Sequence, residues 1–279
     1  MNIPRDKYIR VNQLRLHYLD WGKGGDKTLL LLHGFMSHAH MWDNLATELS
    51  ARYYVLALDQ RGHGDSEWSK GAYYSIDSHF SDISVFIESL GLEKVIILGH
   101  SMGGRNALFY AACAPEKVER LILVDARLGT NPEAPRALRR QLASLPLKAN
   151  TMDEVVEALR MLYPYLSIEM CRHIAKYGYR ESKDGRFIPK YDTKMSSQLE
   201  KSEYTTEEFW DMINNVACPT LIVRGKESPF VSLEEAQKMC MVLPRATFQE
   251  IHQATHMPAQ ENPDAFMRVI FDFLSLPDL

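Results

Sequence analysis

Cysteine is scarce in this chain of 279 residues, and its four cysteines form no paired pattern. None of them stands in a C-x-x-C motif or at a regular interval from the others. Zinc sites and disulfide frameworks both depend on such spacing, so we expect neither. We interpret the four thiols as reduced core residues. They are Cys113, Cys171, Cys218 and Cys240.

Long apolar stretches and strongly basic segments are also missing. The longest aliphatic run, Leu29 to Leu32, is far too short to cross a bilayer, and residues 1–7 contain no apolar signal segment. The net charge is −4, and no basic run is dense enough to bind nucleic acid. We therefore expect a cytoplasmic protein that acts on a small molecule, with no nucleic-acid or membrane partner.

Short apolar runs alternate with helical patterns along the chain. Between the runs, apolar residues recur at helical spacing, as Ile76, Phe80, Ile83 and Ile87 do. This alternation is typical of a mostly parallel sheet with helices on both faces, so we predict an α/β fold. The first run alternates like a strand at the sheet edge. The expected strands are residues 14–19, 29–32, 53–58, 95–98, 121–124, 221–223 and 247–251.

The alternation stops after residue 124. From about residue 129 to residue 210 the chain is rich in charge and in helix formers, and it has no convincing buried strand. The run that follows Pro219 then restores the sheet pattern. We predict that residues 129–210 form a helical lid over the carboxyl ends of the strands, where open parallel sheets bind ligands. Residues 1–128 and 211–279 would form the two parts of the core.

Residues 95–104 read V-I-I-L-G-H-S-M-G-G, an apolar run that stops at Ser101 and passes into a helical pattern. This is the signature of a nucleophile elbow, in which a serine stands on a strained strand-to-helix turn. Bulky side chains two residues on either side would collide there, and Gly99 and Gly103 avoid this. The following helix brings free N–H groups beside the hydroxyl. We predict that Ser101 is a nucleophile.

A serine hydroxyl is a weak nucleophile until a base accepts its proton. His256 is the candidate base, because it follows the last predicted strand in a loop that leads into the closing helix. His252 lies close enough in sequence to be a rival. We interpret most of the other histidines as surface, helix or turn residues.

Negative charge that develops on a substrate oxygen needs two preorganised donors. The backbone N–H of Met102 would supply one of them. The loop after the strand at residues 29–32 would bring the N–H of Phe35 as the other, with His33 orienting that loop.

Four segments stand in a specific order: L-L-H-G-F at 31–35, D-Q-R-G-H-G-D-S at 59–66, G-H-S-M-G-G at 99–104, and the late His256. Together they resemble the α/β-hydrolase superfamily over essentially the whole core. The resemblance implies an eight-stranded, mostly parallel sheet and a catalytic triad in the chain order serine, acid, histidine. A serine nucleophile also argues against the haloalkane dehalogenases and epoxide hydrolases of this superfamily, which use aspartate there.

The triad acid departs from the pattern of the relatives. They usually carry it after the seventh strand in G-x-x-D, where this chain has Gly225 and, at the acid position, Ser228. Serine cannot fix the histidine tautomer or offset the imidazolium charge. Asp125, directly after the run at 121–124, is the leading substitute, since some superfamily members have their acid after strand six. Glu227, one position out of register, is the rival, and the lack of any acid is the third alternative.

Two weaker patterns carry charge or metal-binding groups. An H-x-H pair at His38 and His40 has no further spaced ligands, so we expect no metal. The predicted lid contains cations that would attract an anionic substrate, although a solvated helix face explains them as well. These cations are Arg136, Arg139, Arg140 and Lys148.

We expect a carboxylesterase that needs no cofactor, in which Ser101 attacks a small ester, His256 transfers the proton and Asp125 orients His256. The same groups would cleave an amide, a lactone or a C–C bond in a small acidic metabolite. A second hypothesis is a non-catalytic ligand sensor on the same fold, supported only by the serine at the usual acid position.

Overall fold

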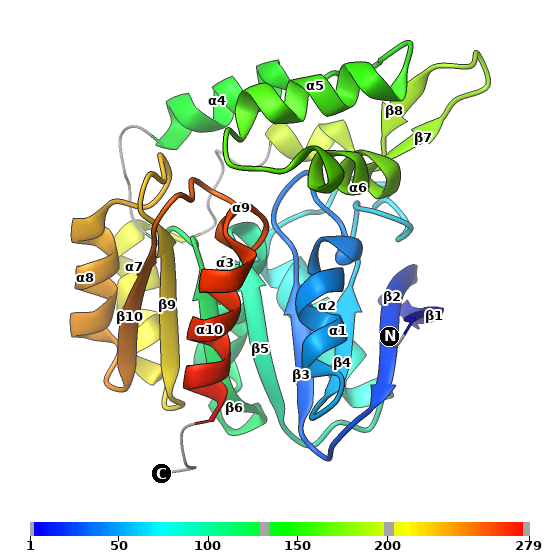
Figure 1. The fold of residues 1–279 in the computed structure, drawn as a ribbon. Coiled ribbons are helices and arrows are strands. Elements are labelled where there is room, and N and C mark those ends of the chain that lie inside the picture. The colour runs from blue at the N-terminus through cyan, green and yellow to red at the C-terminus, as the bar shows by residue number, and fades with distance from the viewer. Residues whose placement is uncertain (1–2, 129–133, 198–203, 276–279) are drawn as a thin grey trace.

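The computed structural model describes residues 3–128, 134–197 and 204–275. Its centre is an eight-stranded sheet in the order β1-β2-β4-β3-β5-β6-β9-β10 (Figure 1). Only the β1–β2 and β2–β4 pairs are antiparallel, so the predicted α/β fold with a mostly parallel sheet is confirmed. The strands are β1 (Arg5–Val11), β2 (Leu14–Lys23), β3 (Thr28–Leu32), β4 (Tyr54–Leu58), β5 (Val95–His100), β6 (Val118–Val124), β9 (Thr220–Gly225) and β10 (Ala246–Ile251).

Every strand predicted from an apolar run is present, but β1 was not predicted. Its sequence, RDKYIRV, is charged and mostly exposed, because an edge strand carries charge rather than an apolar run. The run at residues 14–19, which we expected at the edge, lies in β2, one strand further in.

Helices cover both faces of the sheet. Successive residues of β3 point to opposite faces, so Leu29 and Leu31 pack into one hydrophobic core and Leu30 and Leu32 into the other. Burial on both faces explains why this strand reads as an unbroken apolar run. The core helices are α1 (Asp43–Leu49), α2 (Ile76–Ser89), α3 (Met102–Cys113), α7 (Thr206–Met212), α8 (Leu233–Val242), α9 (Pro258–Glu261) and α10 (Pro263–Leu274), with 3-10 turns at Ala39–Trp42, Pro115–Lys117 and Ile213–Asn215.

Residues 134–197, between β6 and α7 in the chain, gather at one end of the sheet, above the core in Figure 1. They contain α4 (Ala134–Ser144), α5 (Met152–Leu162), α6 (Ile168–Gly178), the short hairpin of β7 (Tyr179–Glu181) and β8 (Phe187–Pro189), and a 3-10 turn at Thr193–Ser197. We call residues 134–197 the insertion. The expected lid start, residues 129–133, lies outside the described residues. At the expected end of the lid, residue 210, α7 packs on α3 through Phe209 and Phe109. The three-part division stays a prediction.

A cluster of histidines joins the insertion to the core. His38 Nε2 donates to the carbonyl of Ile174 in α6 at 3.1 Å, and the ring of His40 stacks on Tyr177 with 3.6 Å between centroids. His173 lies 3.3 Å from a carboxylate oxygen of Asp43, and this contact raises the pKa of His173. The H-x-H pair therefore contacts α6. Among the described helices, none combines the length and the hydropathy that a membrane span requires.

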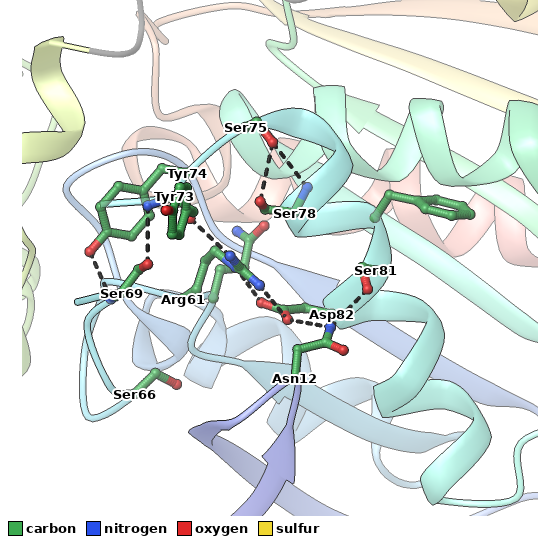
Figure 2. A network of polar contacts seen from close by, with 12 residues as sticks. Asn12, Arg61, Ser66, Ser69, Tyr73, Tyr74, Ser75, Ser78, Ser81 and Asp82 are labelled. Atoms are coloured by element: carbon green, nitrogen blue, oxygen red, sulfur yellow. Dashed lines mark hydrogen bonds and ion pairs between the residues drawn. The ribbon is translucent and has the colours of Figure 1, made fainter. Parts of the chain in front are cut away.

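The loop that follows β4 is fixed by a buried ion pair. Arg61 donates two hydrogen bonds to the carboxylate of Asp82 in α2, at 2.6 and 2.7 Å, and a third to the carbonyl of Tyr73 at 2.8 Å (Figure 2). Asn12, in the turn between β1 and β2, donates to Asp82 at 2.9 Å. The network thereby ties the loop, the helix and the turn together.

Replacing Asp82 with alanine should lower the free energy of unfolding by about 3–5 kcal/mol, because Arg61 is then left buried without its counter-charge. Asn12→Ala is the control. It removes the hydrogen bonds of the Asn12 amide to Asp82 and Ser81 and places alanine at φ 46°, and it should cost about 1–2 kcal/mol. Urea unfolding followed by circular dichroism measures both. Equal losses in the two variants would contradict the importance of the ion pair.

Candidate active site

Ser101 occupies a strained turn between β5 and α3. Its backbone has φ 51° and ψ −116°, a conformation that costs a non-glycine residue about 1–3 kcal/mol. A Cβ atom on Gly99 would lie 2.3 Å from the carbonyl oxygen of Gly103. One on Gly103 would lie 2.5 Å from the carbonyl oxygens of Leu32 and His33. Both contacts are impossible, so the turn requires glycine at both positions, as the sequence pattern indicated.

Three predicted residues from distant parts of the chain meet at this turn. Nε2 of His256 lies 3.0 Å from Oγ of Ser101, and Nδ1 of His256 lies 2.7 Å from Oδ2 of Asp125. Asp125 is 1% exposed and directly follows β6. The three side chains form one continuous chain of hydrogen bonds. It allows a proton to pass from the serine oxygen to an imidazole whose other nitrogen faces a carboxylate.

Ser228, at the usual acid position, contacts the carboxylate of Asp125. Its hydroxyl donates to Oδ2 of Asp125 at 2.6 Å, and the backbone N–H of Gly225 donates to Oδ1 at 3.2 Å. The Ser228 oxygen in turn accepts from the backbone N–H groups of Phe230 and Val231. The loop after β9 therefore holds a carboxylate that the end of β6 supplies.

The two rival residues have other contacts. Glu227 accepts a hydrogen bond from the backbone N–H of Ala254 at 3.1 Å. His252 is exposed, and its Nδ1 lies 3.4 Å from the Lys226 ammonium. Within the described part of the chain, the ring of His256 forms hydrogen bonds with Ser101 and Asp125 alone.

The loop after β3 lies directly against the nucleophile. A Cβ atom on Gly34 would be 3.2 Å from Cβ of Ser101. His33 braces this loop, because its Nδ1 lies 2.7 Å from the Gly34 carbonyl and its Nε2 accepts from the Gln60 backbone N–H at 3.0 Å. Met102 is the first residue of α3, so its backbone N–H has no acceptor carbonyl one turn earlier in the helix. That this N–H and that of the next loop residue, Phe35, bind an oxyanion stays a prediction.

His100 supports the site in a way that the sequence analysis missed. Its Nε2 donates to the backbone carbonyl of His256 at 2.6 Å, which fixes the loop that carries the base. Burial and the neighbouring His256 hold the pKa of His100 well below its usual value, so the ring is neutral. We interpreted most of the other histidines as surface, helix or turn residues. His40, His79 and His173 lie in helices and His63 and His252 in bends, whereas His17 and His100 lie in strands. The buried ones besides His256 are His17, His33, His38, His63, His79 and His100.

One group of possible metal ligands occurs among the described residues, formed by His17, Asp59 and Asp65. Burial opposes the charge on Asp59, but the hydrogen bond from His17 at 2.7 Å lowers the pKa of this carboxyl. Asp65 pairs with Lys190 at 2.7 Å. Contacts within the protein therefore already occupy these groups.

A cavity of about 690 Å³ opens beside His256. Its core side includes Glu227 and Phe230, from the loop after β9. The insertion contributes other lining residues, among them Arg136 and Arg140 of α4. The size suits a small organic molecule.

Comparisons with known proteins give consistent matches. The profile of the α/β hydrolase fold matches residues 27–162. A 2-(acetamidomethylene)succinate hydrolase from Mesorhizobium japonicum is 27% identical over 98% of each chain. A 2-hydroxy-6-oxononadienedioate/2-hydroxy-6-oxononatrienedioate hydrolase from Pseudomonas putida is 26% identical over 96% of each chain. The crystal structure of E-2-(acetamidomethylene)succinate hydrolase aligns with a TM-score of 0.88 at 25% identity, and covers 98% of this chain and 100% of that one.

Removing the Ser228 hydroxyl should slow the reaction of Ser101 with a fluorophosphonate probe about tenfold, because a hydrogen bond to a charged carboxylate contributes about 1.5–3 kcal/mol. The variants are Ser228→Ala, which lacks the hydroxyl, and Ser228→Thr, which keeps it. Labelling rates under pseudo-first-order conditions compare them. If both variants react as fast as the unchanged protein, Ser228 does not hold Asp125.

Proposed function

Because this chain belongs to the α/β-hydrolase superfamily, we propose that it is a serine hydrolase that cleaves small carboxylic esters. The observation that carries this proposal is the continuous chain of hydrogen bonds from Ser101 through His256 to Asp125. In this proposal the substrate is a small molecule in the cytoplasm, and the insertion acts as a lid over the cavity.

The reaction proceeds through an acyl-enzyme. Oγ of Ser101 attacks the ester carbonyl while Nε2 of His256 accepts its proton, and the Asp125 carboxylate offsets the imidazolium charge. The N–H groups of Phe35 and Met102 stabilise the oxyanion. The C–O bond then breaks as His256 returns the proton to the leaving alcohol. A water molecule, deprotonated by His256, releases the acid and restores Ser101.

An amide, lactone or C–C bond in a small acidic metabolite is the second candidate substrate. The chain aligns almost end to end with two hydrolases whose names specify a substituted succinate and a dienedioate. The same serine chemistry applies to these bonds. A non-catalytic sensor has lost its only support, since Asp125 lies 2.7 Å from His256 although Ser228 stands at the usual acid position.

Epoxide hydrolysis is a poorer fit despite a 25% identity to epoxide hydrolase 1 of Caenorhabditis elegans. In the superfamily that chemistry uses an aspartate nucleophile, and this chain has Ser101 at the strained turn.

A fluorophosphonate probe should label the protein at Ser101, because the hydrogen-bonded imidazole activates this hydroxyl. Peptide mass spectrometry identifies the site, and the labelling should vanish in Ser101→Ala. A panel of p-nitrophenyl esters of increasing chain length then measures turnover. Intact protein that neither reacts with the probe nor hydrolyses any ester of the panel would overturn the proposal.

The acid assignment predicts opposite results for two carboxylate-to-amide variants. Asp125→Asn should reduce kcat by about a thousandfold or more, because the histidine then loses its correct tautomer and its counter-charge. Glu227→Gln, the matched control from the next loop, should leave turnover of a neutral ester within about threefold. Hydrolysis of p-nitrophenyl hexanoate measures both, and the reverse ranking would assign the acid to Glu227.

A further inference from the structure

We infer that Arg136 and Arg140 bind a carboxylate of the substrate, so that the enzyme prefers esters bearing an acidic group at the end remote from the scissile bond. This inference rests on the proposed function, because it takes the cavity beside His256 as the substrate site.

The two arginines lie on one face of α4. They are four residues apart, which puts their Cβ atoms about 5–6 Å from each other on the helix surface. Both line the cavity that also contains His256. Arg139, on the same helix, does not line it. Both arginines are exposed, so the solvent-facing side of α4 also lines this cavity.

Three other cations of the insertion are paired with carboxylates. Lys148 and Arg186 contact Asp184 at 2.7 and 2.9 Å, and Lys190 contacts Asp65 at 2.7 Å. By contrast, within residues 3–128, 134–197 and 204–275, neither the Arg136 nor the Arg140 guanidinium has an ion-pair partner. Two guanidinium groups on a cavity wall are therefore available to an external anion.

The core contributes an acidic residue to the cavity lining. Glu227 lines the cavity, as His256 does, and its carboxylate is an acceptor-only group. A dicarboxylate half-ester is repelled from Glu227 and attracted to α4. This charge asymmetry would direct its acidic end to the arginines and its ester group toward Ser101.

A neutral donor lies beside the arginines. The amide of Gln141 donates to the hydroxyl oxygen of Tyr163 at 2.6 Å, so the hydroxyl proton is free to point to another acceptor. Burial raises the pKa of Tyr163, which keeps this proton in place. Both residues line the cavity. Two guanidinium groups, each with paired N–H donors, and one hydroxyl donor suit the two acceptor oxygens of a carboxylate.

The test uses two substrates that differ only in the terminal group: mono-p-nitrophenyl adipate, which ends in a carboxylate, and p-nitrophenyl hexanoate, which ends in a methyl group. We expect kcat/KM to be at least about tenfold higher for the adipate ester. Arg136→Gln and Arg140→Gln should each lower the ratio of the two kcat/KM values, adipate ester over hexanoate, about tenfold, because only the adipate ester loses an ionic contact. Arg139→Gln is the matched control and should leave the preference unchanged.

Calorimetric binding of free adipate to Ser101→Ala separates this inference from the proposed function. Adipate should bind Ser101→Ala at least about tenfold more tightly than it binds the variant that also carries Arg136→Gln and Arg140→Gln. Equal adipate affinities, or equal ester preference in all arginine variants, would overturn the inference while hexanoate turnover upholds the esterase. A loss of all turnover with the affinity difference intact would instead reject the esterase and leave the carboxylate site standing.

Discussion

The hydrogen bond between Nδ1 of His256 and Oδ2 of Asp125 joins residues 131 positions apart, and the geometry of the candidate site depends on it. It fixes which nitrogen of the imidazole faces Ser101, because the other nitrogen is committed to the carboxylate. The bond is short only because parallel strands end together at one edge of the sheet. Asp125 follows β6, and its own backbone N–H donates to Val223 of the neighbouring β9 at 2.7 Å.

Different segments around this bond hold the strained backbone of Ser101, the histidine and the carboxylate. Ser101 keeps an unfavourable backbone conformation because β5, α3 and the glycines of the turn leave it no alternative. His100, one residue earlier, is bonded to the backbone of His256, so the strand that presents the nucleophile also holds the base. The hydroxyl of Ser228 likewise holds the carboxylate of Asp125 through a hydrogen bond. His256 and Asp125 are therefore each held by a residue that takes no direct part in the proposed reaction.

The cavity adds a second level of organisation, because its two walls come from different parts of the chain. The core supplies the reactive histidine and the carboxylate of Glu227, and the insertion supplies Arg136 and Arg140. Charged groups of both signs in one cavity lining can orient a polar molecule before any reaction begins. An insertion that changes its sequence can thus change the substrate without altering the residues at the end of the sheet.

The sequence by itself determined the α/β fold and most strands of the sheet. It also identified Ser101 and His256 as the two residues whose side chains lie in contact. These features leave a local pattern: buried parallel strands are continuously apolar, and the turn at Ser101 requires glycines at fixed spacing. Edge strand β1 escaped prediction because its solvent exposure removes that pattern.

Only the tertiary structure decided the contacts between segments. Asp125 and Glu227 were both open as partners of His256, since chain order does not give the direction of a side chain at the end of a strand. The structure directs Asp125 to His256 and Glu227 to a backbone N–H. The cavity-facing position of Arg136 and Arg140 was equally hidden, because helical periodicity gives a face but not what that face packs against.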